Sequence, residues 1–414
     1  MADYDGDGLA DYSWYLPHTQ MWRVYESSNG HAERDRLEIG ATQDLPVQAP
    51  IALFPRGTVV VQVDESEPVG ASSGIRGVSI DVDSLDQPHV IGERREAGLD
   101  AYHRFDGVWS ADEPFLVPPG AAGSPNLEID ARDRGWISYT SFISGDTVNS
   151  GEWVALMDDV AEAPSLAWEA MVPPYVGFSG YLSLDPNEPD ACWRMGGQPA
   201  PTWRFDADGT ATQDITLSPG ISSETIGFEI APVEAGAEPG VWHAAHSVIY
   251  QAVRSGYVNS AMEAPVIWDD HLDVISVDSD YTRAYVGLDR RDPEVAYINT
   301  FHDGLVVNIW DGEQLVFPSD DVYLLDPAPA AFGNGSERFG AQWTSAARAG
   351  AWLCWTGADG WIRLKWFSYE GETAFGETLA IVQGQQCALA TDHRGHLQMA
   401  YVDGTMHYLR IRTR

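Results

Sequence analysis

A repeating pattern of short strands and turns runs through most of the chain. Each unit has a small apolar strand, a turn, and a second strand rich in β-branched and aromatic residues, most clearly in residues 78–109 and 388–410. Seven such units begin near residues 77, 126, 181, 225, 284, 339 and 386. A period of roughly 45 to 60 residues is typical of the four-stranded blades of β-propellers. The sequence therefore predicts an all-β fold, a β-propeller with seven blades.

The edge strands of such sheets dictate how the chain must end. A ring of sheets buries every apolar face only if the two chain ends complete one blade together. The last unit stops at its third strand, near Met406 to Arg412. We therefore expect the segment from Tyr12 to Tyr25 to supply closing strands, so that residues 1–414 form a single domain closed by pairing of N- and C-terminal strands. A β-sandwich, with two sheets stacked face to face, is the alternative architecture.

Acidic residues dominate the charge of the chain. Asp and Glu number 62 against 24 Lys and Arg, which gives a net charge of −38. A surface this negative repels phosphate backbones and anionic lipids, which argues against nucleic acid as a partner. No apolar run is long enough to span a bilayer, so membrane insertion is not expected. The charge suits solubility in a salty or calcium-rich exterior, and we expect the protein to be a monomer.

The cysteine content is low. Cys192, Cys354 and Cys387 are too few for a disulfide framework and lack the spacing of metal ligands. They are consistent either with one disulfide bridge or with three buried thiols that behave as small apolar residues. The sequence leaves these two alternatives open.

An acidic loop lies at the start of the chain. Residues 3–11 place carboxylates at alternate positions, with glycines between them that permit a sharp turn. Several oxygens around one point in a flexible loop are what Ca²⁺ binds. Position twelve of an EF-hand loop would be Trp14 here, so this loop is of another type. The predicted Ca²⁺ ligands are Asp3, Asp5, Asp7, Asp11 and the backbone carbonyl of Leu9.

This N-terminal segment resembles a known calcium-binding repeat. The acidic loop, followed by Ser13-Trp14 and by Met21-Trp-Arg-Val24, is similar to an FG-GAP/VCBS-type repeat, in which such a loop is coupled to a hairpin. The later units resemble the BNR-like class of extracellular propellers, but they lack the Asp box of its sialidase members. The resemblance implies a secreted, calcium-stabilised protein. Because the chain enters the loop at Asp3, we expect that a signal peptide has been removed.

One group of residues has the chemistry of a polysaccharide lyase. His243, His246, Tyr250 and Arg254 lie within one short stretch. A His and a Tyr can abstract and return a proton beside a carboxylate, and an Arg can neutralise that carboxylate. These four are the candidate catalytic residues. Ordinary strand residues are the alternative interpretation, and zinc binding by the two histidines is another, although no third ligand is near in the sequence.

Two further sets of polar residues have side chains that could take part in chemistry. Residues 102–104 (Tyr-His-Arg) occupy the third strand of the first unit, and His407 occupies the same place in the last unit, a recurrence that indicates a structural role. Adjacent acidic residues have the chemistry of glycosidase carboxylates, but solvated turns account for such pairs in a chain this acidic. These pairs are Asp158-Asp159, Asp269-Asp270 and Asp320-Asp321.

Two functions follow from these observations. The chain holds 16 Trp and 17 Tyr, whose rings pack between sheets or, where exposed, stack on sugars. The first expectation is an extracellular module, without catalysis, that binds a glycan or a protein and is stiffened by Ca²⁺. The alternative is a carbohydrate-active enzyme, a polysaccharide lyase or glycosidase, with its site in the propeller funnel. Exposed aromatic faces would favour binding, and a convergent His/Tyr/Arg or carboxylate cluster would favour the enzyme.

Overall fold

The computed structural model describes the strands and many of the tight turns of the chain. None of the described residues is helical, so this part of the chain contains no helix that could cross a membrane. The chain divides into two compact units, Met1–Gln62 (unit 1) and Val63–Arg414 (unit 2). The described residues are 12–16, 21–26, 32–38, 61–63, 67–94, 98–105, 109–110, 121–143, 146–161, 164–172, 181–185, 190–195, 201–216, 225–232, 241–248, 252–259, 267–273, 283–288, 296–302, 304–310, 315–317, 323–326, 341–345, 350–367 and 378–413.

Unit 1 contains one small antiparallel sheet in its described part. Its strands are β1 (Tyr12–Leu16), β2 (Met21–Glu26) and β3 (Ala32–Glu38), paired in the order β1-β2-β3. Aromatic and β-branched residues in β1 and β2 favour the extended backbone. The short strand β4 (Val61–Val63) lies at the boundary between the two units.

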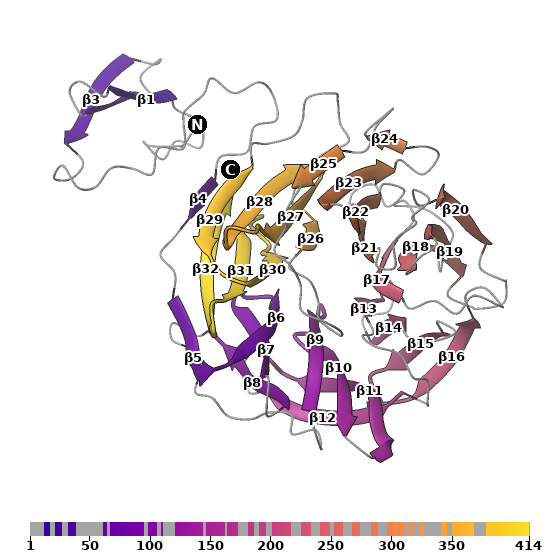
Figure 1. The fold of residues 1–414 in the computed structure, drawn as a ribbon. Helices are drawn as coiled ribbons and strands as arrows, with labels where there is room; N and C mark the ends of the chain where they lie inside the picture. The colour runs from indigo at the N-terminus through magenta and orange to yellow at the C-terminus, as the bar shows by residue number, and fades with distance from the viewer. Residues whose placement is uncertain are drawn as a thin grey trace. The chain divides into compact units, whose positions relative to one another are not determined.

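Unit 2 consists, over its described residues, of seven antiparallel sheets that follow one another along the chain (Figure 1). Within each sheet, each strand after the first pairs with the strand before it in the chain, except β25, which pairs with β23. Sheet 1 contains β6 (Ile75–Val82), β7 (Pro88–Arg94) and β8 (Gly98–Arg104); sheet 2 contains β9 (Ala121–Ile129), β10 (Gly135–Ile143), β11 (Asp146–Asp158) and β12 (Ser165–Met171); sheet 3 contains β13 (Tyr181–Leu184), β14 (Ala191–Met195), β15 (Pro201–Asp206) and β16 (Ala211–Thr216).

The remaining sheets of unit 2 repeat this arrangement. Sheet 5 has two short strands, β24 and β25, which both pair with β23. Sheet 4 contains β17 (Thr225–Pro232), β18 (Val241–Val248), β19 (Ala252–Asn259) and β20 (Ile267–Asp273); sheet 5 contains β21 (Arg283–Leu288), β22 (Ala296–His302), β23 (Gly304–Trp310), β24 (Leu315–Phe317) and β25 (Tyr323–Asp326); sheet 6 contains β26 (Ala341–Ser345), β27 (Ala351–Thr356), β28 (Trp361–Phe367) and β29 (Leu379–Gln383); sheet 7 contains β30 (Gln386–Thr391), β31 (Leu397–Val402) and β32 (Thr405–Thr413).

The predicted unit starts coincide with the beginnings of these sheets. Residues 77, 126, 181, 225, 284 and 386 each lie in the first strand of a sheet, and residue 339 just precedes β26. The repeating pattern of strand and turn residues in the sequence therefore indicates where each sheet of unit 2 begins.

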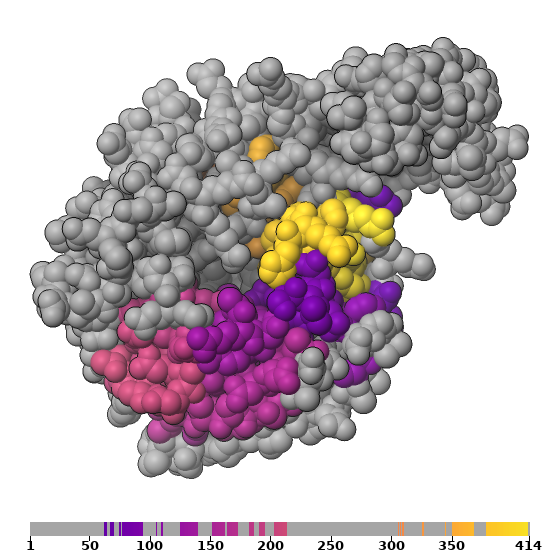
Figure 2. All heavy atoms as spheres, turned by 180° about the vertical axis from the view of Figure 1, so that it is seen from behind, coloured from indigo at the N-terminus to yellow at the C-terminus, as the bar shows by residue number. Residues whose placement is uncertain are grey.

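The first strands of the seven sheets contact one another in succession. The contacts run from β6 to β9, β13, β17, β21, β26 and β30, and β30 also contacts β6. Figure 2 shows the indigo residues of sheet 1 between the yellow C-terminal residues of sheet 7 and the magenta residues of sheet 2. Seven sheets packed in this order differ from the two stacked sheets of the β-sandwich alternative.

A strand that precedes sheet 1 extends sheet 7. β5 (Glu67–Ser73) pairs antiparallel with β32, and Val69 lies opposite Met406. The sequence predicted pairing of early and late strands but assigned it to residues 12–25, which lie mainly in β1 and β2 and pair with each other. β5 has the sequence EPVGASS, with one β-branched residue, so its composition did not identify it as a strand.

The apolar core lies between neighbouring sheets. Side chains from two adjacent sheets form each cluster: Ile80 and Val90 of sheet 1 pack with Ala388 and Val402 of sheet 7. Every residue of β27 and of β31 is buried, whereas β12, the last strand of sheet 2, is mostly exposed. A strand that is buried on both faces must have another sheet on each side of it, and this explains its continuous apolar sequence.

The packing of sheet 7 against sheet 1 can be tested at Met406. This side chain is fully buried and belongs to the cluster that joins sheets 7 and 1. Met406→Ala should lower the free energy of unfolding by about 2–5 kcal/mol, because it removes a buried side chain and leaves a cavity. Urea denaturation measures this change. Met171→Ala, in the outer strand β12, is the control and should cost less; equal losses would contradict the assignment.

Candidate functional site

Five tight turns of unit 2 share one backbone geometry. In each, the N–H of the first residue donates to the carbonyl of the fifth, and the N–H of the fourth donates to the carbonyl of the first. The fourth residue has a positive φ of 57° to 85°, which glycine and, less often, aspartate adopt. The turns begin at Asp83, Asp130, Asp206, Gly357 and Asp392, and their fourth residues are Asp86, Asp133, Gly209, Gly360 and Gly395.

Three of these turns are built around a buried aspartate, Asp83, Asp130 or Asp392, each at most 5% exposed. One carboxylate oxygen accepts the backbone N–H groups two and four residues later, at 2.8–3.1 Å. The other oxygen bonds a side chain six residues later, in the next strand. These partners are His89 at 3.0 Å, the indole N–H of Trp136 at 3.0 Å and the amide N–H of Gln398 at 2.7 Å.

The charge on Asp83 depends on these bonds. Burial by itself would raise the pKa of this carboxyl, but hydrogen bonds from His89 and from the backbone amides of Gln87 and Leu85 lower it below its usual range. The carboxylate is therefore ionised at neutral pH and fully engaged within its own hairpin. A buried charge is tolerated only where such partners compensate for the lost hydration.

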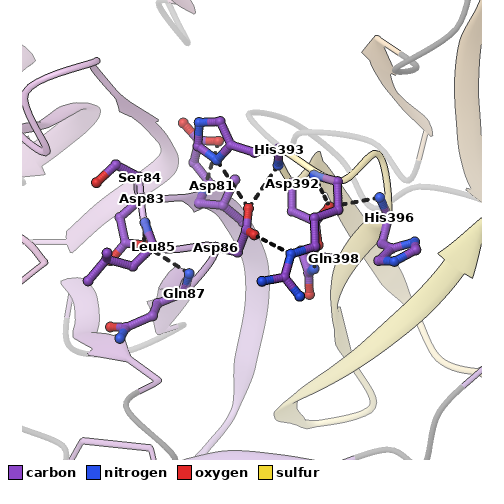
Figure 3. A network of polar contacts seen from close by, with 12 residues as sticks. Asp81, Asp83, Ser84, Leu85, Asp86, Gln87, Asp392, His393, His396 and Gln398 are labelled. Atoms are coloured by element: carbon purple, nitrogen blue, oxygen red, sulfur yellow. Dashed lines mark hydrogen bonds and ion pairs between the residues drawn. The ribbon is translucent and has the colours of Figure 1, made fainter. Parts of the chain in front are cut away.

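Further carboxylates link the turns of neighbouring sheets (Figure 3). Asp86 of sheet 1 accepts the backbone N–H of His393 at 2.8 Å and pairs with Arg394 at 3.2 Å, both in the turn of sheet 7. Asp133 of sheet 2 accepts the N–H and the hydroxyl of Ser84, in the turn of sheet 1, both at 2.7 Å. The same turn position thus bonds to the preceding sheet in both cases. This network connects sheets 7, 1 and 2 and has a structural role.

The described residues contain no group of three or more His, Cys, Asp or Glu side chains that could hold a metal ion. The turn network was not predicted from the sequence. Its signal is an aspartate followed three residues later by Asp or Gly and six residues later by His, Trp or Gln, as at residues 83–89, 130–136 and 392–398.

A different surface carries an exposed aromatic ring. Trp361, the first residue of β28, is 37% exposed, and it is the one exposed large aromatic among the side chains that the structure describes. Arg363 lies two residues later and therefore on the same face of the strand. It forms a two-pronged pair with Asp359, at 3.0 and 2.8 Å, and Gln383 of β29 lies opposite Trp361. We call Asp359, Trp361, Arg363 and Gln383 the Trp361 surface.

The Trp361 surface combines an apolar plane with fixed hydrogen-bonding groups. The hydrogen bond from Arg363 lowers the pKa of Asp359, so the pair is ionised at neutral pH. Asp359 also accepts the backbone N–H of Trp361 at 3.1 Å, which ties the turn to the start of β28. An indole face can stack on an apolar or ring-shaped ligand, while guanidinium, carboxylate and amide groups donate to and accept from hydroxyls.

The backbone brings two of the candidate catalytic positions and one acidic residue into one row of sheet 4. His246 of β18 lies opposite Arg254 of β19, and Arg254 lies opposite Asp270 of β20. His243 lies opposite Tyr257. Tyr250 lies outside the described residues. In the sequence, Asp270 is recognisable only as part of the acidic pair Asp269-Asp270. Its position next to Arg254 depends on strand register and has no local signal.

The other candidates are divided between structural positions and undescribed ones. His407 contacts Asp403 at 3.0 Å and Thr405 at 2.9 Å within the hairpin that joins β31 and β32, which agrees with a structural role. Residues 102–104 lie in β8. Asp158 ends β11, and Asp159 has a positive φ of 52° in the turn that follows. The calcium loop, with Asp3, Asp5, Asp7, Leu9 and Asp11, lies outside the described residues, as does Asp320-Asp321.

No family model and no curated protein matches this sequence. Among solved structures, a protein of unknown function from Dyadobacter fermentans is 11% identical, with a TM-score of 0.46, and the match covers 86% of this chain and 99% of that one. A streptogramin B lyase is 11% identical, with a TM-score of 0.48 over 86% of this chain and 98% of that one. A mutant of AofleA from Arthrobotrys oligospora is 10% identical, with a TM-score of 0.48 over 79% and 91%. These similarities are too low to bear on what this chain binds.

The structural role of the turn aspartates can be tested at Asp392. Asp392→Ala removes the acceptor of two backbone N–H groups and of Gln398 and Arg410. We expect the free energy of unfolding to fall by about 3 kcal/mol, because buried donors lose a charged partner. Asp208→Ala is the control: that carboxylate is exposed, and it accepts the N–H of Thr210, at 2.8 Å, within its own turn. Equal effects of both substitutions in urea denaturation would contradict the assigned role.

Proposed function

We propose that unit 2 is a seven-bladed β-propeller, in which β5 closes the ring beside β32, and that the protein is an extracellular module that binds a glycan. The architecture is supported by seven successive sheets and by the contacts of their first strands, which lead from β6 back to β6. The pairing of β5 with β32 gives the last sheet a further strand, as ring closure requires. A protein ligand is the other class of partner for such a surface.

The observation that carries the binding proposal is the Trp361 surface. The Trp361 indole is 37% exposed, so part of its ring is accessible to a ligand, and it lies beside the Arg363–Asp359 pair. Sugars present one apolar ring face and a rim of hydroxyls, which match an aromatic plane flanked by donors and acceptors. The pair orients its charged groups before any ligand arrives, and this reduces the entropic cost of binding.

Calcium is the cofactor that we propose for the N-terminal segment. Asp3, Asp5, Asp7 and Asp11 would supply carboxylates, and Leu9 its carbonyl. A hard divalent cation would neutralise these negative charges and hold the loop in one conformation. The protein carries a net charge of −38, so bound Ca²⁺ would also reduce its self-repulsion. This proposal places the protein outside the cell, where calcium is abundant.

Removal of two calcium ligands tests the metal proposal. Asp5→Ala together with Asp7→Ala should lower the melting temperature in calcium and abolish the response to EDTA, because the loop loses charged ligands. Asp208→Ala, which removes an exposed carboxylate from unit 2, should keep the response of the unmodified protein. Differential scanning calorimetry with and without EDTA measures both effects. Identical melting of the unmodified protein in calcium and in EDTA would refute the proposal.

Binding to a glycan array tests the ligand proposal. We expect the unmodified protein to bind at least one glycan, and Trp361→Ala to weaken that binding by roughly tenfold or more, since an aromatic anchor carries much of the energy of a binding site. Leu166→Ala is the matched control, because it removes an exposed apolar side chain from sheet 2. Absence of glycan binding, or equal binding by Trp361→Ala, would contradict the proposal.

A carbohydrate-active enzyme is the second candidate function. The row formed by His246, Arg254 and Asp270 favours it, because a base, a cation and a carboxylate share neighbouring positions of sheet 4. A lyase would convert an acidic polysaccharide into an unsaturated uronate, whose ultraviolet absorbance rises as the reaction proceeds. The glycans of the binding experiment therefore distinguish the two functions: a bound ligand stays intact, whereas a substrate is cleaved and His246→Ala prevents the cleavage.

A further inference from the structure

Two cysteines from different sheets lie side by side in the core. Cys354 is in β27 of sheet 6 and Cys387 is in β30 of sheet 7, and these strands contact each other. Their exposed fractions are 0% and 3%, and both carry thiols in this structure. The two thiols are close enough to share a hydrogen bond. Cys192 lies elsewhere, in the cluster between sheets 2 and 3.

The surroundings of this pair connect it to the end of unit 2. Sheets 6 and 7 also contact through β26 and β30, where the hydroxyls of Thr344 and Thr391 are 3.1 Å apart. Sheet 7 in turn contains β32 and its partner β5. A covalent bond between the two cysteines would thus tie sheet 6 to the sheet that joins the early and late strands of unit 2.

We propose that Cys354 and Cys387 form a disulfide that links sheet 6 to sheet 7 when the chain folds in the presence of a low-molecular-weight disulfide such as oxidised glutathione. One cysteine thiolate attacks a glutathione sulfur, and the glutathione S–S bond breaks to give a mixed disulfide and one glutathione. The second cysteine thiolate then displaces the other glutathione. The protein loses two electrons and two protons, and one oxidised glutathione becomes two reduced ones. This inference does not depend on the proposed ligand.

The timing of this reaction follows from burial. Burial, together with the neighbouring Cys354, raises the pKa of the Cys387 thiol well above its ordinary value. The thiolate is the reactive form, so the folded, reduced protein should react slowly with an oxidant. The bond therefore forms while the sheets are still assembling, when both thiols are accessible.

Peptide mapping tests the proposal directly. The protein is refolded from denaturant in a mixture of reduced and oxidised glutathione, alkylated under denaturing conditions and digested with trypsin. Cleavage after Arg348, Arg363, Lys365 and Arg394 places the two cysteines on separate peptides, 349–363 and 366–394. We expect these two peptides as one linked species that separates on reduction, and we expect alkylated Cys192 on peptide 135–194.

Matched variants separate the bond from a general effect of cysteine loss. Cys354→Ser refolded in the same way should yield no linked species, and Cys192→Ser should retain the link. The oxidised protein should melt about 5 °C above the reduced protein, and this difference should disappear in Cys354→Ser. Alkylation of all three cysteines after oxidative refolding, or a link that involves Cys192, would overturn the proposal.

Discussion

Burial of both faces of each sheet is the constraint on which the structure of unit 2 depends. A strand such as β31 is buried along its whole length, and one sheet cannot cover both of its own faces. Each core cluster is therefore shared by two neighbouring sheets, as where Trp136 of sheet 2 packs with Trp203 and Phe205 of sheet 3. No sheet in such a series is stable by itself, because its apolar faces are covered by neighbouring sheets. The outer face of the first sheet is therefore expected to pack against the last sheet. Contact between β6 and β30, and pairing of β5 with β32, meet this need.

The polar ends of the sheets are organised by the turn aspartates. A buried carboxylate destabilises a fold unless donors surround it, and Asp83, Asp130 and Asp392 each obtain those donors within one hairpin. Carboxylates at the fourth turn position then bond to the preceding sheet, as Asp86 does to His393. These carboxylates are hydrogen-bonded within the fold and are not available to a ligand. A binding site is therefore expected where other polar groups adjoin exposed apolar surface. Among the described residues, the Trp361 surface has this character.

Much of the fold could be predicted from the sequence because the sheets repeat. The recurring strand and turn pattern located the first strand of each sheet, since alternating apolar residues and Gly or Asp turns are local features. β5 was missed because a strand of sequence EPVGASS owes its pairing to β32, far away in the chain, and not to its own residues. The turn aspartates carried a local signal that becomes evident once their hydrogen bonds are known. The row of His246, Arg254 and Asp270 had no local signal, because strand register alone brings these positions together.

Hydrogen exchange of β5 determines whether this strand pairs with β32, because backbone amides that pair in a packed sheet exchange slowly. The intact protein is first exchanged and then digested with pepsin. Mass spectrometry compares deuterium uptake in the peptides that cover Glu67–Ser73 and Thr405–Thr413. If β5 closes unit 2 beside β32, amides of both strands are protected, and both strands lose protection together as urea is added. Exchange of β5 at the rate of an unstructured peptide, while β32 remains protected, would contradict closure of unit 2 by this strand.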